Sequence, residues 1–221
     1  MQAYIFDLDG TLFDSMGVWL DIDAAFFKKR GIASSPDYFN IVSAMTLPEA
    51  AVHTKSKYNL PESPQEILKE WFEMALHAYE NTVQMKPFAK EYLAKLKQNG
   101  ARLAIATSSP PELYKPLLKR FEIYDWFETI CNANDVGCGK SRPDIFLLVA
   151  KKLNVKPTEC IVFEDILEAV ISAKSIGMTV YAIYDKSSAK DWLQIQKTAD
   201  AAFTSWEEVH NTKCQHHNIG F

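Results

Sequence analysis

From residue 85 onward the chain alternates short apolar runs of β-strand character with longer stretches whose apolar residues recur at helical spacing. This alternation predicts βαβ units, in which parallel strands form one sheet and helices pack against its faces. The predicted strands are residues 3–6, 102–106, 129–131, 160–163, 179–183 and 201–203, and the predicted helices are 88–98, 111–121, 144–153 and 166–175. The sequence therefore predicts an α/β fold whose first strand is distant in sequence from the others.

The long segment between the first two predicted strands shows helical patterns and no strand pattern. Its clearest helix begins at Ser63-Pro64-Gln65-Glu66, which has the form of a capping box with proline in the first helical position. We expect residues 15–84 to form a separate helical cap over the carboxyl ends of the strands, and residues 1–14 and 85–221 to form the α/β core. The last residues, 210–221, are expected to be irregular.

The charge balance argues against a nucleic-acid partner. The 221 residues contain 24 Lys and Arg against 28 Asp and Glu, so there is no basic surplus to neutralise a run of phosphates. The N-terminal residues lack the pattern of a signal peptide, and no run approaches the roughly 18 apolar residues of a membrane helix. We therefore expect a cytoplasmic protein that binds neither nucleic acid nor membrane, with a monomer as the default state.

Polar side chains follow four of the predicted strands at the points where those strands end. Ligands of open parallel sheets bind at this edge, where the strand order reverses. The first strand is followed by two carboxylates, the second by two hydroxyls, the third by an ammonium group and the fourth by two more carboxylates: Asp7, Asp9, Thr107, Ser108, Lys140, Glu164 and Asp165. We expect these groups to converge on one site.

The carboxylates of this set predict a cation site. Asp7 and Asp9 are two residues apart, which on an extended chain directs both side chains to the same side, and Gly10 then permits a sharp turn. With Glu164 and Asp165 nearby, such a cluster would be very costly without a cation. Oxygen ligands favour Mg²⁺ over Zn²⁺.

The remaining groups predict a phosphate site opposite the cation. Thr107 and Ser108 precede a helix start at Ser109-Pro110-Pro111-Glu112, so their backbone N–H groups would lie at the positive end of a helix dipole. Lys140 adds a full positive charge. Together with a magnesium ion, these donors describe a phosphoryl-transfer pocket.

Four segments resemble, in order, the four motifs of the haloacid dehalogenase superfamily, in its phosphatase branch near the β-phosphoglucomutase-like group. The segments are Phe6-Asp7-Leu8-Asp9-Gly10-Thr11-Leu12-Phe13-Asp14-Ser15, Ala106-Thr107-Ser108, Gly139-Lys140-Ser141-Arg142-Pro143-Asp144-Ile145-Phe146 and Val162-Phe163-Glu164-Asp165. The resemblance covers nearly the whole chain and implies a Rossmann-like parallel sheet core with an inserted all-α cap domain. The sequence departs from many relatives in having Ile166 and Ala169 where Ser and Gly are common.

The resemblance also implies a role for each residue. Asp7 would be the nucleophile that forms an aspartyl-phosphate, and Asp9 would protonate the leaving group and later deprotonate water. The metal ligands would be the side chains of Asp7 and Asp165 and the backbone carbonyl of Asp9, assisted by Glu164. The phosphoryl oxygens would be bound by Thr107, Ser108 and Lys140.

The leading interpretation is thus a Mg²⁺-dependent phosphatase that hydrolyses a small phosphorylated metabolite. A β-phosphoglucomutase-like phosphomutase is the main alternative, although residues 42–47, at the place of the mutases' basic cap element, contain no basic residue. A non-catalytic phosphate-binding protein stays open, and a dehalogenase is less favoured because the second aspartate is retained. We expect Met16, Trp19, Met45 and Thr46 to shape the leaving-group pocket.

Overall fold

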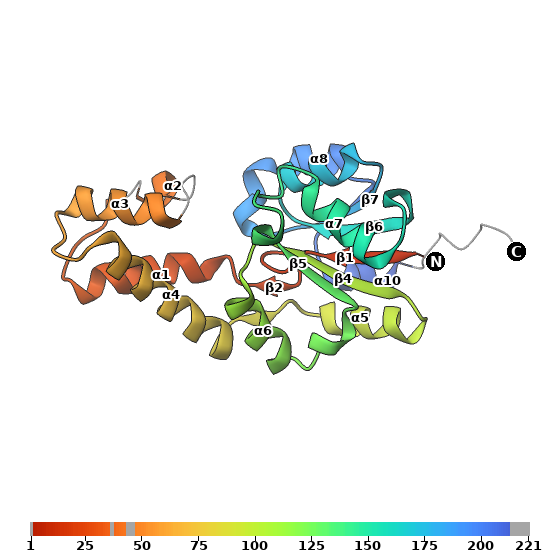
Figure 1. Ribbon diagram of the computed structural model, residues 1–221, viewed down its shortest axis with the longest axis horizontal. Coiled ribbons are helices and arrows are strands. Elements are labelled where there is room, and N and C mark those ends of the chain that lie inside the picture. The colour runs from red at the N-terminus through yellow and green to blue at the C-terminus, as the bar shows by residue number, and fades with distance from the viewer. Residues whose placement is uncertain (1, 36–37, 43–46, 213–221) are drawn as a thin grey trace, which may run out of the picture. The chain divides into compact units, whose positions relative to one another are not determined.

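The computed structural model describes residues 2–35, 38–42 and 47–212 (Figure 1). Its internal packing divides the chain into two units. The first unit is Met1–Ser15 with Gln84–Phe221, and the second is Met16–Val83. Each unit is described by itself below.

The first unit is built on a parallel sheet. Within its described residues, six strands lie in the order β5-β4-β1-β6-β7-β8. They are β1 (Ala3–Phe6), β4 (Arg102–Thr107), β5 (Thr129–Asn132), β6 (Cys160–Glu164), β7 (Thr179–Ile183) and β8 (Ala201–Phe203). Strand β1 lies between β4 and β6, with Phe6 level with Ile105 on one side and Phe163 on the other. The predicted parallel α/β sheet is confirmed, and the strand order reverses at β1.

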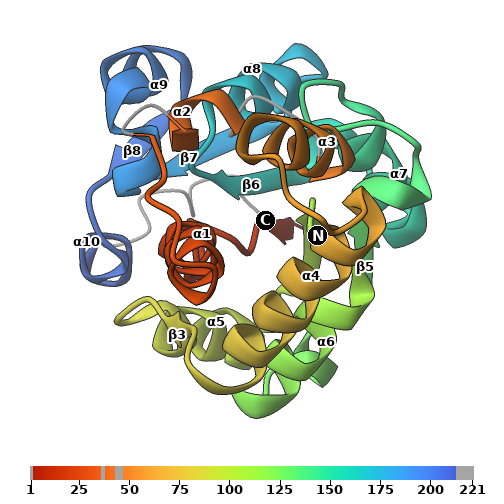
Figure 2. The same cartoon turned by 90° about the vertical axis from the view of Figure 1, so that its left-hand side faces the viewer.

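Helices cover both faces of this sheet (Figures 1 and 2). On one face, small and branched strand residues such as Ile5 and Val162 pack against α7 (Asp144–Leu153), α8 (Leu167–Ser175) and α9 (Trp192–Thr198). On the other face lie α5 (Ala89–Gln98), α6 (Pro111–Arg120) and α10 (Trp206–Asn211). There Phe163 stacks on Phe6 at 4.9 Å and contacts Trp206 at 5.0 Å between ring centroids. Both faces are therefore buried, which explains the nearly continuous apolar strands.

Two very short strands were not predicted. Strand β2 (Phe13–Asp14) pairs antiparallel with β3 (Gln84–Met85) where the chain leaves and re-enters the first unit. Two residues are too few to establish a period of two, so the sequence pattern carries no signal for them. The prediction of an irregular C-terminal segment is wrong for residues 210–211, which end α10. The N-cap of that helix is Ser205, whose hydroxyl accepts from Glu208 N. Residues 213–221 lie outside the described part.

The described part of the second unit is helical. It comprises α1 (Gly17–Lys29), α2 (Tyr38–Val42), α3 (Leu47–Tyr58) and α4 (Pro64–Asn81), and both α1 and α3 pack on α4. The capping box is confirmed, since Ser63 Oγ accepts from Glu66 N and Glu66 Oε2 accepts from Ser63 N at 2.7 Å. Trp71 packs edge-on against Phe26 in the interior.

Among the described residues of the whole chain, no helix is both long and apolar enough to cross a membrane.

Candidate active site

The polar residues predicted from the sequence lie at one edge of the sheet, in the first unit. Asp7 follows the carboxyl end of β1, Thr107 is the last residue of β4 and Glu164 is the last residue of β6. Lys140 lies in the loop before α7, and its ammonium group donates to both Asp7 and Glu164. The structure thus gathers groups from four distant parts of the chain at the switch point of the sheet, where ligands of such folds bind.

Three buried carboxylates form the centre of this site. Asp7, Glu164 and Asp165 each offer an oxygen atom, and these three atoms lie within 4.8 Å of one another. Their residues are at most 4% exposed, so water screens their charges poorly. Such close anions destabilise one another, and only one side-chain ammonium, that of Lys140, is paired with any of them among the described residues.

The electrostatics reflect this deficit of positive charge. The pKa of Asp7 is raised to about 7, because burial and the charges of Glu164 and Asp9 together outweigh the opposing effect of Lys140. Burial also raises the pKa of Asp165 well above its usual value, and the charges of Glu164 and Asp7 add to this. Burial lowers the pKa of Lys140, but the charges of Asp7 and Glu164 outweigh it and the net shift is upward. The site therefore favours an additional cation.

The hydrogen bonds indicate which carboxylates are free to hold that cation. Both oxygens of Glu164 are engaged, Oε1 by Lys140 and Oε2 by the backbone N–H groups of Asp165 (2.9 Å) and Ile166 (3.2 Å). By contrast, Asp7 Oδ2 and Asp165 Oδ2 are buried without a hydrogen-bond partner among the described residues. Buried carboxylate oxygens normally have partners. The donor set, all oxygen, fits a hard divalent cation such as Mg²⁺.

Gly10 brings the loop after β1 close to Asp165. Its φ is +89°, a conformation that other residues rarely adopt, and a Cβ atom at this position would overlap the Asp165 carboxylate. The next residue, Thr11, donates through Oγ1 to Asp165 Oδ1 at 3.0 Å. The sharp turn predicted at Gly10 is confirmed, and its consequence is that this loop forms one wall around Asp165.

Asp9 is held by two hydroxyl groups. Ser15 Oγ donates to Asp9 Oδ1 at 2.6 Å, and Ser109 Oγ donates to Asp9 Oδ2 at 2.5 Å. Ser109 N in turn donates to Thr107 Oγ1 at 3.0 Å, which links the end of β4 to Asp9. The sequence analysis assigned Ser109 only to the start of a helix. Its position beside two polar residues at a strand end is a signal for a site role, but the distance in sequence to Asp9 hides the partner.

Two of the expected phosphate donors, Thr107 and Ser108, lie at the end of β4 and directly after it. Thr107 is fully buried and Ser108 is exposed. Helix α6 begins at Pro111, so its first turn follows directly after these residues. This placement leaves the Ser108 segment at the positive end of a ten-residue helix, as phosphate binding would require.

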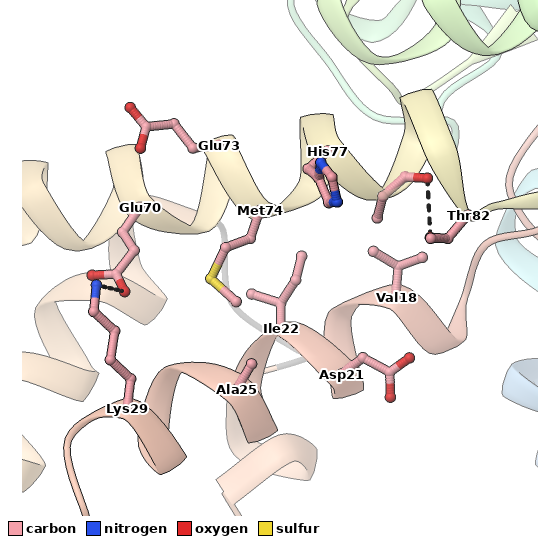
Figure 3. A pocket seen from close by; sticks show the side chains of 11 residues that line it. Val18, Asp21, Ile22, Ala25, Lys29, Glu70, Glu73, Met74, His77 and Thr82 are labelled. Carbon is pink, nitrogen blue, oxygen red and sulfur yellow. Dashed lines mark hydrogen bonds and ion pairs between the residues drawn. The ribbon is translucent and has the colours of Figure 1, made fainter.

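The predicted specificity residues belong to the second unit. Met16 and Trp19 are partly buried at the start of that unit, while Met45 and Thr46 lie outside the described residues. The described residues of this unit enclose a groove of about 630 Å³ between α1 and α4. Across it, Ile22 of α1 faces Met74 of α4, and Val18 lies nearer to Thr82 (Figure 3). Neither Met16 nor Trp19 lines this groove.

Comparison with known proteins gives concordant matches. The family model of haloacid dehalogenase-like hydrolases matches residues 1–177. The chain is 26% identical over 212 residues to the phosphorylated carbohydrates phosphatase of Thermotoga maritima, covering 96% of this chain and 97% of that protein. It is 28% identical over 181 residues to hexitol phosphatase B of Escherichia coli K12, covering 80% of each. A solved Thermotoga maritima structure, provisionally named a beta-phosphoglucomutase, matches with a TM-score of 0.83 at 27% identity, covering 96% of this chain and 97% of that one.

Proposed function

This chain belongs to the haloacid dehalogenase-like hydrolases, and on that premise we propose that it is a Mg²⁺-dependent phosphatase that hydrolyses a small phosphorylated metabolite through a phosphorylated Asp7. The resemblance carried by the four motifs is confirmed by the family match. The predicted reaction class, phosphoric monoester hydrolysis, agrees with the names of the relatives above. The metal, the covalent step and the substrate class are the parts proposed here.

One observation carries the proposal: two buried carboxylates with unpartnered oxygens lie beside a buried lysine. Asp7 Oδ2 and Asp165 Oδ2 lack partners among the described residues, while Lys140 donates to the other oxygen of Asp7. A phosphoryl group is itself anionic and needs positive charge on more than one side. Lys140 can supply one side, and a cation on Asp7 and Asp165 would supply the other. Of the three buried carboxylates, Asp7 is the one that both accepts from Lys140 and keeps an unpartnered oxygen among the described residues.

The cation would be held by the side chains of Asp7 and Asp165 and by the backbone carbonyl of Asp9. When bound, Mg²⁺ neutralises charge on the phosphoryl oxygens and favours the ionised form of Asp7. Glu164 is proposed to act differently from these ligands, because its two oxygens already accept from Lys140 and from two backbone N–H groups. It would orient Lys140 and the loop that carries Asp165.

The residues present account for both halves of the reaction. In the first half, an oxygen of Asp7 attacks phosphorus, the bond between phosphorus and the leaving oxygen breaks, and Asp9 gives that oxygen its proton. In the second half, Asp9 takes a proton from water as the water oxygen attacks phosphorus, which releases phosphate and restores Asp7. Ser15 and Ser109 orient the Asp9 carboxylate for these transfers through the hydrogen bonds described above. Lys140, Thr107 and Ser108 N–H would hold the phosphoryl oxygens.

We also propose that the helical unit, Met16–Val83, is the cap of this enzyme. Its residues Met16, Trp19, Met45 and Thr46 would contact the leaving group and select the substrate. A cap that closes over the site would exclude water and large molecules, so a free metabolite is favoured over a phosphoprotein. This proposal rests on the resemblance and on the position of the unit in the chain, between β2 and β3.

Following the product distinguishes a phosphatase from a mutase, which transfers a phosphoryl group between two positions of one sugar. With β-glucose 1-phosphate, glucose 1,6-bisphosphate and Mg²⁺, we expect release of inorganic phosphate and no appreciable glucose 6-phosphate, because residues 42–47 contain no basic side chain to hold a second phosphate. A panel of sugar, nucleotide and short-chain phosphates assayed for phosphate release would identify the substrate. Rapid formation of glucose 6-phosphate without phosphate release would favour the mutase instead.

A further inference from the structure

Lys86 lies against the loop that carries Asp9, although the proposed function assigns it no part. It directly follows β3, and its side chain is 15% exposed. Its ammonium group donates to the Gly10 carbonyl, to the Tyr184 carbonyl at 2.9 Å, and to Asp185 Oδ2 at 2.9 Å. An ammonium group has three N–H donors, so these acceptors engage all of its donors.

Asp185, the carboxylate that pairs with the Lys86 ammonium group, is itself held by hydrogen bonds. Asp185 is 6% exposed, and its other oxygen, Oδ1, accepts from Ser187 N at 2.9 Å and Ser187 Oγ at 2.7 Å. Burial alone would raise the pKa of Asp185, but the Ser187 hydrogen bonds and Lys86 together lower it below its usual value. Asp185 is therefore ionised at neutral pH and fixes the ammonium group beside Gly10.

Lys86 also binds the loop through its backbone. Three consecutive carbonyls of this loop accept hydrogen bonds: Gly10 from Lys86 Nζ, Thr11 from Trp206 Nε1 at 2.9 Å, and Leu12 from Lys86 N at 2.9 Å. Lys86 thus supplies two of the three donors. Since β3 pairs with β2 directly after the loop, the residue is placed there by the local strand pairing as well as by its side chain.

Fixing Gly10 also fixes two of the three groups proposed to hold the cation. Gly10 N donates to Phe13 O at 2.9 Å, and because the peptide group is planar and trans, the Asp9 carbonyl points the opposite way. On its other side Gly10 packs so closely against Asp165 that no side chain fits. With both the N–H and the carbonyl of Gly10 bonded, the direction of the Asp9 carbonyl is fixed, and the Asp165 carboxylate packs against the same residue.

We propose that Lys86 is a positioning residue of the cation site, which holds the Gly10 carbonyl so that the Asp9 carbonyl and Asp165 keep the spacing that Mg²⁺ requires. This inference rests on the proposed function, since it assumes that the site takes Mg²⁺. Mg²⁺ demands near-ideal octahedral geometry at short distances, so a loosened ligand weakens binding strongly. Groups that orient metal ligands typically contribute about 10- to 100-fold in metal affinity.

The test is calorimetric titration of Mg²⁺ into the full-length protein and its variants. We expect Lys86→Met, which keeps the length of the side chain without its donor, to raise the Mg²⁺ dissociation constant about tenfold or more. Lys86→Arg keeps a donor and is expected to bind Mg²⁺ more tightly than Lys86→Met. The matched control is Lys174→Met. Lys174 is in the same unit and pairs with Asp200 at 2.7 Å. Asp200 directly precedes β8, so this ion pair lies at the edge of the sheet where the strands begin, away from the site.

Each result has a definite meaning. If the unmodified protein binds no Mg²⁺, the proposed function fails and the inference falls with it. If it binds Mg²⁺ while Lys86→Met stays within twofold of it, or Lys174→Met weakens binding as much, or the Arg and Met variants are equally weakened, Lys86 has only a structural role. If Lys86→Met does not fold because Asp185 is left unpaired, the variant Lys86→Met/Asp185→Asn, which removes both charges, is titrated in its place and judged by the same criteria.

Discussion

Asp7→Asn is expected to lower kcat/KM for an aryl phosphate by about a thousandfold or more, because an amide cannot form the bond to phosphorus. The fold should be retained. Asparagine has the shape of aspartate, and the buried charge that it removes is costly, as the pKa of about 7 for Asp7 indicates. Lys140 would keep its ion pair with Glu164. Steady-state kinetics with p-nitrophenyl phosphate, together with thermal unfolding, measure the two effects separately.

Asp14→Asn is the matched control for this substitution. Asp14 lies in the same segment, seven residues further on, and is exposed in β2. The chemical change is the same, but no role in the site is assigned to Asp14, so the rate should stay within about twofold of the original enzyme. If Asp7→Asn kept more than about a thousandth of the rate, the attacking group would have to be another residue.

Removal of the divalent cation is expected to abolish turnover almost as completely. Asp7 and Asp165 would then face the anionic substrate with two buried, unpartnered oxygens, and burial would favour the protonated form of Asp7. A bound cation is worth several kcal/mol of charge stabilisation, so dialysis against EDTA should reduce the rate about a hundredfold or more. Phosphate release before and after chelation measures this loss.

The control for chelation is the restoration of activity. Excess MgCl₂ should restore the rate, whereas NaCl at the same ionic strength should not, because screening by salt does not place a cation between the carboxylates. An undiminished rate in EDTA, with the metal removed as judged by elemental analysis, would show that Lys140 and the α6 N-terminus suffice without a metal.

Much of the fold follows from local sequence patterns. Each strand and helix predicted in the first unit is present, with bounds that differ by one residue at most, because strands buried on both faces have continuous apolar runs and the helices between them have a clear apolar stripe. Strands β2 and β3 were missed because two residues carry no periodicity, and the helices α9 and α10 because seven and six residues barely form one apolar face.

The sequence predicted those site residues that come at or after the ends of strands. Asp7, Lys140, Glu164 and Asp165 converge because parallel strands bring their carboxyl ends to one edge. The hydrogen bonds between distant residues were not predicted. Lys86 reaches backbone carbonyls 76 and 98 residues away, and because every residue has such a carbonyl, no residue type in the sequence marks the partner. The Ser109 hydroxyl reaches the Asp9 carboxylate across 100 residues, a separation that local sequence patterns do not bridge.

The identity of the phosphorylated residue tests the central claim most directly. In Asp9→Asn, the second half of the reaction loses its base, while p-nitrophenolate leaves without a proton, so the covalent intermediate should accumulate on an aryl phosphate. Acid quenching followed by borohydride reduction converts an aspartyl-phosphate to homoserine, which peptide mass spectrometry locates. The account predicts homoserine at position 7. Homoserine at any other position, or phosphate found on a serine, threonine or histidine, would contradict it.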